Sequence, residues 1–423
     1  MEFRIKILLI SFIASFASFS SFANNSSGSC RDFLNGLTEV PSPSGAEKSF
    51  GQWLRWEQLN NLEKYRQRTA PISVGVVQVP RDRVTIAISK NAPKIFQSLF
   101  VNVDGVVWPK HPYNRAKQVP YFDHSTEAAL TGHLTASRSI AFLSSDGKTA
   151  YSIKMPTDFP NLDRRQAEKI RLNDDINAAV RRSDLIDAMD QRLGADPDLL
   201  ILRDVMSVRD KESGNGYIVR DLSPLLDGHL YLPAFSIPFE GKNIAQKAGA
   251  DVLSYWGQHY VAAVAKAKAK LLLRYGLVMH TPNAQNFLIQ MTPELRPTGK
   301  IVVRDLGDSY HVPKILEAIG EPQITASEEA VRLDPVNNGF SKSHNKISFG
   351  GFEKSGVPEL SFENLKMNWG PIHSAAFDQE IKSALGIGSN SEDSLRRLTA
   401  GNLIDFLFSA EGQSLLKNYH ARK

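Results

Sequence analysis

One stretch of the sequence, residues 275–308, combines side chains that suit the binding of a nucleotide and a metal ion. His280 and two asparagines, Asn283 and Asn286, follow a long helical segment, and Asp305 ends the second of two strand-like segments that come next. If these strands pair, His280, Asn286 and Asp305 lie at one edge. Carboxylate and amide oxygens are hard ligands for Mg²⁺, and a histidine can contact phosphate. The pattern predicts a nucleotide–metal site in which either asparagine supplies the amide.

A second group of charged residues lies on a predicted β-hairpin. Two β-rich segments, 139–144 and 149–155, flank an Asp-Gly turn at 146–147, and Asp-Gly supplies the positive φ angles that a tight turn needs. Arg138 and Lys154 stand at the outer ends of the two arms, so both cations can point to one face and hold a triphosphate. The developing charge of phosphoryl or adenylyl transfer is then met from both sides of the predicted site.

The elements that must position these residues are predicted from periodicity and turn signals. Before the hairpin, a helix is expected first, and three β-rich segments separated by Pro, Asp and Asn follow it: 50–62, then 73–79, 83–88 and 99–107. After the hairpin we expect a charged helix and two strands joined by a turn at 211–216: 163–194, then 198–206 and 216–221.

The C-terminal part begins with a long Ala-rich helix, for which Gly276 is a plausible stop. Two strand-like segments and an amphipathic helix follow that helix, which gives the series 243–275, 284–290, 300–306 and 393–419. The predicted fold class is α+β. It has an N-terminal helix and sheet, a middle hairpin-containing domain and a C-terminal helical-plus-sheet domain, with an intervening cleft between the last two: 24–110, 111–240 and 241–423.

The sequence resembles the siderophore synthetases that work without nonribosomal peptide synthetases, the IucA/IucC family. In that family a long helix ends in Tyr-Gly, and a His-x-Gln-Asn loop, aliphatic residues and Arg-Asp-x-x-Gly follow; here the matching residues are Tyr275-Gly276, His280, Gln285-Asn286 and Arg304-Asp305. The family's earlier elements match His111-Pro112, Ala136-Ser137-Arg138-Ser139 in place of Ser-x-Arg-Thr, Lys154 on the hairpin, and Arg164 or Arg165 beyond it. The similarity covers residues 111–310.

The resemblance implies an ATP- and Mg²⁺-dependent transferase or ligase. A carboxylate substrate would attack ATP, and an amine would open the resulting acyl-adenylate. The implied roles are catalysis by His280 and Arg304, nucleotide contacts from Arg138, Ser139, Lys154, Arg164 and Asn286, and metal ligation by Asp305 and Asn286.

Two other functions remain open. Val278 and Met279 replace the Glu and Ala that precede the family's histidine, and the chain is shorter than a typical synthetase. The lost Glu, together with the export signal described below, favours a non-catalytic periplasmic binding protein for a siderophore, a polycarboxylate or a nucleotide. The order of His280, Asn286 and Asp305 is also loosely similar to a kinase catalytic loop, which would indicate a phosphoryl or nucleotidyl transferase.

The first 23 residues have the pattern of a cleavable secretory signal. Arg4 and Lys6 precede an apolar run from Ile7 to Phe19, and small residues end at Ala23. The run is shorter than the about 20 apolar residues of a membrane span. We therefore expect an exported chain, periplasmic or secreted, without a membrane span. Its single cysteine, Cys30, allows no intrachain disulfide.

Charge and composition restrict the partners further. The net charge is +5, and it becomes +4 once the signal is removed. Such a mild excess suits a small anionic ligand, while the sequence has no arginine-rich run or RNA-binding motif. We expect a small-molecule carboxylate or nucleotide as partner and no nucleic acid. The sequence leaves the oligomeric state open.

Overall fold

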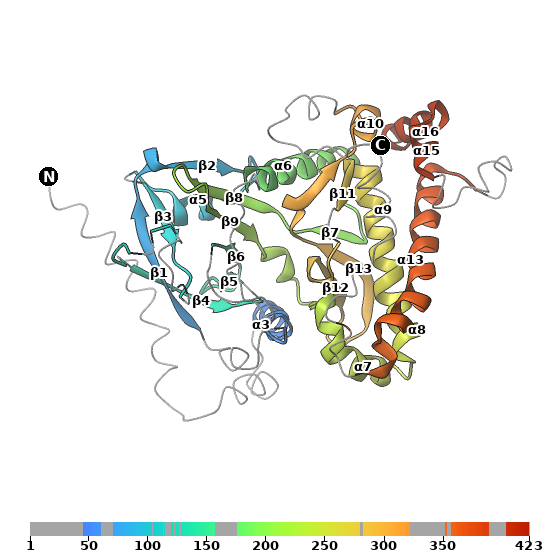
Figure 1. Ribbon diagram of the computed structural model, residues 1–423, viewed down its shortest axis with the longest axis horizontal. Coiled ribbons are helices and arrows are strands. Elements are labelled where there is room, and N and C mark those ends of the chain that lie inside the picture. Colours follow the sequence, from blue (N-terminus) through green and yellow to red (C-terminus); the bar gives the residue numbers. More distant parts are fainter. Residues whose placement is uncertain are drawn as a thin grey trace. The chain divides into compact units, whose positions relative to one another are not determined.

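Two main β-sheets organise the computed structural model, which describes residues 45–60, 71–156 with short gaps between 104 and 137, 176–279, 282–321, 352, 357–388 and 403–422. The larger sheet has the strand order β2-β8-β9-β6-β5-β4-β1-β3, and its named strand pairs are antiparallel (Figure 1). Its strands are β1 (Ile72–Val79), β2 (Val84–Ile88), β3 (Val106–Pro109), β4 (Ala128–Leu134), β5 (Ser139–Leu143), β6 (Ala150–Lys154), β8 (Asp204–Asp210) and β9 (Gly216–Asp221).

The second sheet has four strands in the order β10-β12-β13-β7, and β7 runs parallel to β13. These strands are β7 (Leu199–Ile201), β10 (Leu230–Pro233), β12 (Phe287–Met291) and β13 (Pro297–Val303). A further two-stranded pair joins β11 (Leu277–Met279) to β14 (Ser309–His311). Because β7 precedes β8 by only two residues, the chain passes directly from the smaller sheet to the larger one.

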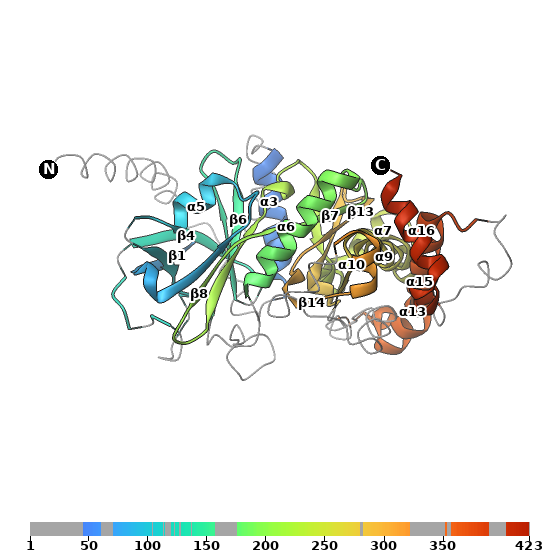
Figure 2. The ribbon, with the colours of Figure 1, turned by 90° about the horizontal axis from the view of Figure 1, so that it is seen from above.

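Helices cover both sheets. In the C-terminal part, α9 and α13 lie side by side, and a π-helical segment at Gly257–Ala262 continues α8 into α9 (Figure 1). Figure 2 shows α6 running along β8, with which it is in contact. The helices are α3 (Gly45–Gln58), α5 (Lys94–Phe100), α6 (Ile176–Leu193), α7 (Ile237–Lys247), α8 (Val252–Trp256), α9 (Ala263–Tyr275), α10 (Pro313–Ala318), α13 (Phe362–Leu385), α15 (Leu403–Phe408) and α16 (Ala410–Ala421).

The hairpin that carries Lys154 is confirmed. β5 pairs with β6 in an antiparallel register that places Ser139 opposite Lys154. Gly147 in the connecting turn has a φ of 66°, a left-handed conformation that glycine adopts without steric cost. On the larger sheet's apolar side, Tyr151 stacks on Phe142 and Tyr217 is fully buried, so aromatic packing fixes these strands.

Four predicted elements differ from the observed ones. The segment 99–107 was expected to be β-rich, but α5 occupies its start, because Phe96 and Phe100 are one helical turn apart and both are buried. The expected strand 198–206 is divided between the two sheets as β7 and β8.

The expected helix 243–275 is interrupted, since α7 starts earlier and Asp251 caps α8 by accepting a hydrogen bond from the Ser254 amide. The described part of the last expected helix, 393–419, is two helices that meet at Ser409, the N-cap of α16. Gly276 does end the long helix, with a φ of 61°. The 24-residue α13 was not predicted.

The observed fold is α+β, as expected. Residues Ser44–Lys423 form one compact unit, and the larger sheet takes strands from both the predicted 24–110 and 111–240 segments. The predicted domain division and the cleft stay predictions. Among the described residues, no helix combines the length and apolar character required to cross a membrane. The expected signal, residues 1–23, and Cys30 lie outside the described residues.

Candidate functional site

An ion pair between Lys154 and Asp305 joins the two halves of the predicted site. Lys154 ends β6 of the larger sheet, and Asp305 follows β13 of the smaller one. The Lys154 Nζ lies 2.9 Å from Asp305 Oδ1 and 3.1 Å from Oδ2, so both carboxylate oxygens accept from it. The side chains are 24% and 26% exposed, which leaves the pair partly open to solvent. Two residues 151 positions apart in the sequence therefore meet.

The backbone at Asp305 has an uncommon conformation. Its φ of 66° and ψ of 49° place it in the left-handed region, where it precedes the short 3₁₀ turn Leu306–Asp308. Aspartate tolerates this region better than most residues, but a non-glycine residue there costs on the order of 1–3 kcal/mol. Just before it, the Arg304 amide donates to the Asn286 carbonyl at 3.0 Å, which fixes the end of β13 against the preceding loop.

Arg220, from β9, is a second cation on Asp305. Its Nη2 lies 3.3 Å from Asp305 Oδ1, while its Nε and Nη2 contact the two carboxylate oxygens of Asp204 at 2.8 and 3.2 Å. Arg220 and Asp204 are opposite each other on β9 and β8. With side chains only 11% and 4% exposed, they form a fixed, buried pair against which Asp305 rests.

These cations keep Asp305 ionised. Burial by itself raises the pKa of Asp305, but the charges of Lys154 and Arg220 outweigh it, and the pKa lies well below the usual range of an aspartate. Arg138 adds to the lowering from the neighbouring hairpin arm. For Arg220, burial opposes the charged form, yet Asp204 and Asp305 overcome this and raise its pKa. The site thus holds a permanent carboxylate among three cations.

The other predicted residues fall into three groups. Ser139 lies opposite Lys154 on β5, and Asn286 is 6% exposed in the 3₁₀ turn Ala284–Asn286 that leads into β12. Ser139 thus adjoins Lys154, and the Asn286 carbonyl accepts from the amide of Arg304, the residue before Asp305. Asn283 is the N-cap of that turn. His280 and Arg164 lie outside the described residues.

Arg304 makes contacts of a different kind. Its Nη1 lies 2.7 Å from Glu57 Oε1, and its Nε donates to the Gln285 carbonyl at 2.8 Å. Glu57 belongs to α3 and is almost completely buried. In this state the guanidinium ties α3 to the smaller sheet, and the catalytic role expected for Arg304 stays a prediction.

The residues present fit a magnesium nucleotide. Asp305 offers an anionic oxygen donor, Asn286 an amide, and Lys154 and Arg138 the positive charges that phosphates require. No group of three or more His, Cys, Asp or Glu side chains in the described part of the chain is arranged to hold a metal.

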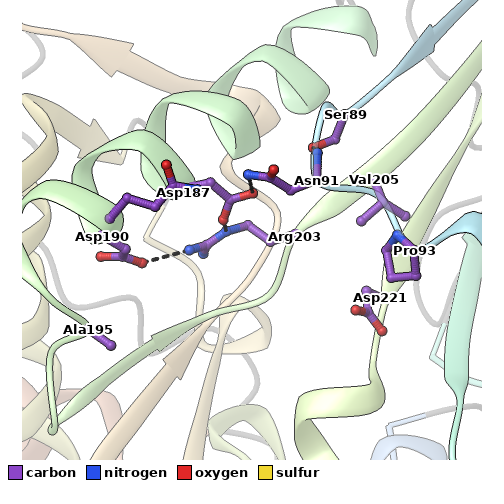
Figure 3. A pocket seen from close by; sticks show the side chains of 10 residues that line it. Ser89, Asn91, Pro93, Asp187, Asp190, Ala195, Arg203, Val205 and Asp221 are labelled. Carbon is purple, nitrogen blue, oxygen red and sulfur yellow. Dashed lines mark hydrogen bonds and ion pairs between the residues drawn. The ribbon is translucent and has the colours of Figure 1, made fainter.

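A separate hollow of about 470 Å³ lies between α6, the start of β8 and the loop after β2. Figure 3 shows Arg203 at its centre, where the guanidinium contacts Asp187 at 2.6 Å and Asp190 at 2.7 Å. Asp221 lines the same hollow. Among the described residues that are predicted to bind the nucleotide, none lines this hollow.

Sequence reasoning missed Arg220 and Asp204. Both stand at the ends of predicted strands, and nothing local distinguishes them from the many charged residues at strand ends. A signal exists only in the pairing register, because opposite charges directly across two strands attract each other. The turn at 211–216 was predicted, but the register shift between Asp204 and Met206, which places Asp204 opposite Arg220, has no signal in the sequence.

Comparison with solved structures supports the fold. The petrobactin biosynthesis protein AsbB from Bacillus anthracis str. Sterne matches with a TM-score of 0.50 at 12% identity, covering 89% of this chain and 72% of that protein. Aerobactin synthetase IucC from a hypervirulent pathotype of Klebsiella pneumoniae gives a TM-score of 0.48 at 13% identity, with coverage of 88% and 75%. ATP-bound aerobactin synthetase IucA from the same pathotype gives 0.47 at 13% identity, with coverage of 90% and 74%.

At these identities the likeness shows the fold alone. It rests on AsbB, whose TM-score reaches 0.50. No family model matches the sequence, and no curated protein matches it.

Proposed function

We propose that this chain binds a magnesium nucleotide at the Lys154–Asp305 site and acts as an ATP-dependent transferase or ligase on a carboxylate substrate. The observation that carries the proposal is the ion pair itself. It joins the cation of one predicted motif to the carboxylate of another across two sheets, at 2.9 Å. The fold similarity to AsbB, a protein of petrobactin biosynthesis, supports the fold that the proposal assumes.

In the proposed complex the chain's own residues divide the work. Lys154 and Arg138 bind phosphate oxygens, and Asp305 with Asn286 hold Mg²⁺. The metal would neutralise the charge that develops on the phosphates. Since Lys154 already contacts a carboxylate, it would exchange this partner for a phosphate when the nucleotide binds. His280 and Arg304 are proposed catalytic groups, and Ser139 and Arg164 are proposed nucleotide contacts.

Calorimetric titration of the purified chain with ATP, with and without Mg²⁺, tests the proposal. Lys154→Ala should weaken ATP binding by about 1–3 kcal/mol, the scale of a charged hydrogen bond. Asp305→Ala should instead abolish the effect of Mg²⁺, because few protein carboxylates hold that ion. Lys148→Ala is the matched control, since Lys148 is an exposed cation in the turn of the same hairpin. Failure of the wild-type chain to bind ATP under either condition would refute the proposal.

A binding protein without catalysis is the second candidate. The observation in its favour is that Val278 and Met279, which replace the family's Glu and Ala, are 5% and 3% exposed within strand β11. Apolar side chains in that buried strand serve packing rather than chemistry. Product analysis separates the candidates, because a ligase that forms an acyl-adenylate converts ATP to pyrophosphate and AMP in the presence of a polycarboxylate and an amine. A phosphoryl transferase would release ADP instead, and a binding protein would leave the ATP intact.

We also propose that the chain is exported, either to a periplasm or beyond, after loss of residues 1–23. The support is the signal pattern in the sequence. Export and ATP use conflict unless a nucleotide is supplied outside the cytoplasm, which adds weight to the binding-protein candidate.

A further inference from the structure

We propose that Arg220 is a positioning residue for this site. It holds the Asp305 carboxylate in place while Lys154 transfers from that carboxylate to a nucleotide phosphate. This inference rests on the proposed function, because the transfer occurs only if a nucleotide binds. It assigns a role to a residue that none of the sequence motifs includes.

The contacts of Arg220 make it the fixed member of the cluster. Its guanidinium is held by both oxygens of Asp204, at 2.8 and 3.2 Å, and it contacts Asp305 at 3.3 Å. The planar fork of an arginine that bonds two carboxylates has little freedom to turn. Since Asp204 is itself only 4% exposed, the guanidinium cannot leave without stranding a buried charge.

Lys154 is the exchangeable member. It is more exposed than Arg220, 24% against 11%, and its ammonium is a compact charge on a flexible stem. If Lys154 turns toward a phosphate, Asp305 loses its nearest cation. Arg220 then remains in direct contact with Asp305 and continues to hold the carboxylate where a hard cation could bind it.

Arg220 also acts on the backbone. The left-handed conformation of Asp305 is unfavourable, and such conformations persist only where the surrounding structure over-determines them. The bond from Arg220 is one of these constraints and is independent of Lys154. Without Arg220, departure of Lys154 would leave the Asp305 side chain without both of its ion-pair contacts, and the left-handed backbone would lose the constraint that they provide.

The experiment compares the ratio of ATP dissociation constants measured without and with Mg²⁺. We expect this ratio to fall about tenfold in the double variant Asp204→Asn/Arg220→Gln, equivalent to about 1.4 kcal/mol. The double variant removes both charges, so no buried ion is left unpaired. In Arg220→Lys the ratio should fall less, by about threefold, because one ammonium cannot bridge two carboxylates as the guanidinium does. The affinity measured without Mg²⁺ should change by less than about twofold in either variant.

Arg203→Gln is the matched control. Arg203 is similarly buried, at 18% exposure, and bridges two carboxylates, Asp187 and Asp190, but it does not contact Asp305. The Arg203→Gln substitution should lower the melting temperature without changing the ratio of ATP dissociation constants measured without and with Mg²⁺. This separates a structural effect from a positioning effect. If the double variant does not fold, the ratio measured for Arg220→Lys alone tests the proposal.

The outcomes are distinct. A wild-type chain that binds no nucleotide overturns the proposed function, and this inference with it. A wild-type chain that binds ATP with Mg²⁺ dependence, together with an unchanged ratio in both Arg220 variants, overturns only the role of Arg220.

Discussion

At the scale of single residues, Asp305 makes the stability of the chain depend on pH. Its pKa in the folded chain lies below the value of about 3.9 that an aspartate has when unfolded. The unfolded chain therefore binds more protons in acid, and the stabilisation from Asp305 is present above the unfolded pKa and is lost as pH falls through the acid range.

Asp305→Asn tests this dependence, and asparagine also tolerates the left-handed backbone. The free energy of unfolding should be lower in the variant than in the wild type at neutral pH, and the difference should shrink as pH falls from about 5 to about 3. Urea denaturation at several pH values measures it. Asp82→Asn serves as a control at an exposed aspartate, where the difference should stay nearly constant. A difference for Asp305→Asn that does not change with pH would contradict the prediction.

The residue scale also shows how far the candidate site could be predicted. Lys154 and Asp305 were identified from motif order and turn chemistry, and the structure brings them into contact. Arg220 was not identified, because its partner Asp305 is 85 positions away and only strand pairing brings the two together. Arg304 was recognised as part of a motif, but its partner Glu57 lies on a helix whose packing the sequence does not reveal.

At the scale of elements, helix α3 connects the two sheets. Gln58 donates to the Leu134 carbonyl at the end of β4 at 2.7 Å, and Glu57 binds Arg304 beyond β13. Trp53 and Trp56 are both buried, so this helix is part of the core. A short helix near the start of the chain thereby supports both sides of the candidate site.

Glu57→Gln should lower the free energy of unfolding by about 3 kcal/mol, because it removes one partner of a buried ion pair. Chemical denaturation measures the loss. The control is Glu212→Gln, which breaks the exposed pair Arg83–Glu212, with side chains 53% and 79% exposed, and should cost less than about 1 kcal/mol. Equal losses in the two variants would show that α3 does not depend on this contact.

Elements defined by turn chemistry were predicted better than those defined by apolar runs. The β5–β6 hairpin and the stop at Gly276 follow from Gly positions with positive φ, a local property. The strand prediction for 99–107 was wrong at its start, because a short apolar run fits a helix or a strand equally well. The helix α5 forms there because it buries both Phe96 and Phe100. Which sheet β7 joins depends on partners about 100 residues away, such as Ile301 opposite Leu199.

At the scale of the whole molecule, the proposed export is a property of the complete chain. Expressed with its first 23 residues in a host that recognises secretory signals, the protein should leave the cytosol and begin at Asn24. Cell fractionation with mass spectrometry of the purified chain measures both. Replacement of the run Ile7–Phe19 by polar residues should hold the protein in the cytosol at full length. Recovery of the unaltered chain uncleaved in the cytosol would overturn the proposal.

The path of the chain between the sheets has a consequence for folding. Strand β7 belongs to the smaller sheet, yet it lies in sequence between β6 and β8 of the larger one, and the Lys154–Asp305 contact closes a loop of 151 positions. Contacts of such long range form slowly, because the entropy of loop closure is lost before the contact stabilises anything. The site therefore matures late, and a nascent or truncated chain that ends before β13 has no carboxylate for Lys154. A ligand of this site would act as a selective probe of the completed fold, since it stabilises only chains in which both sheets are in place.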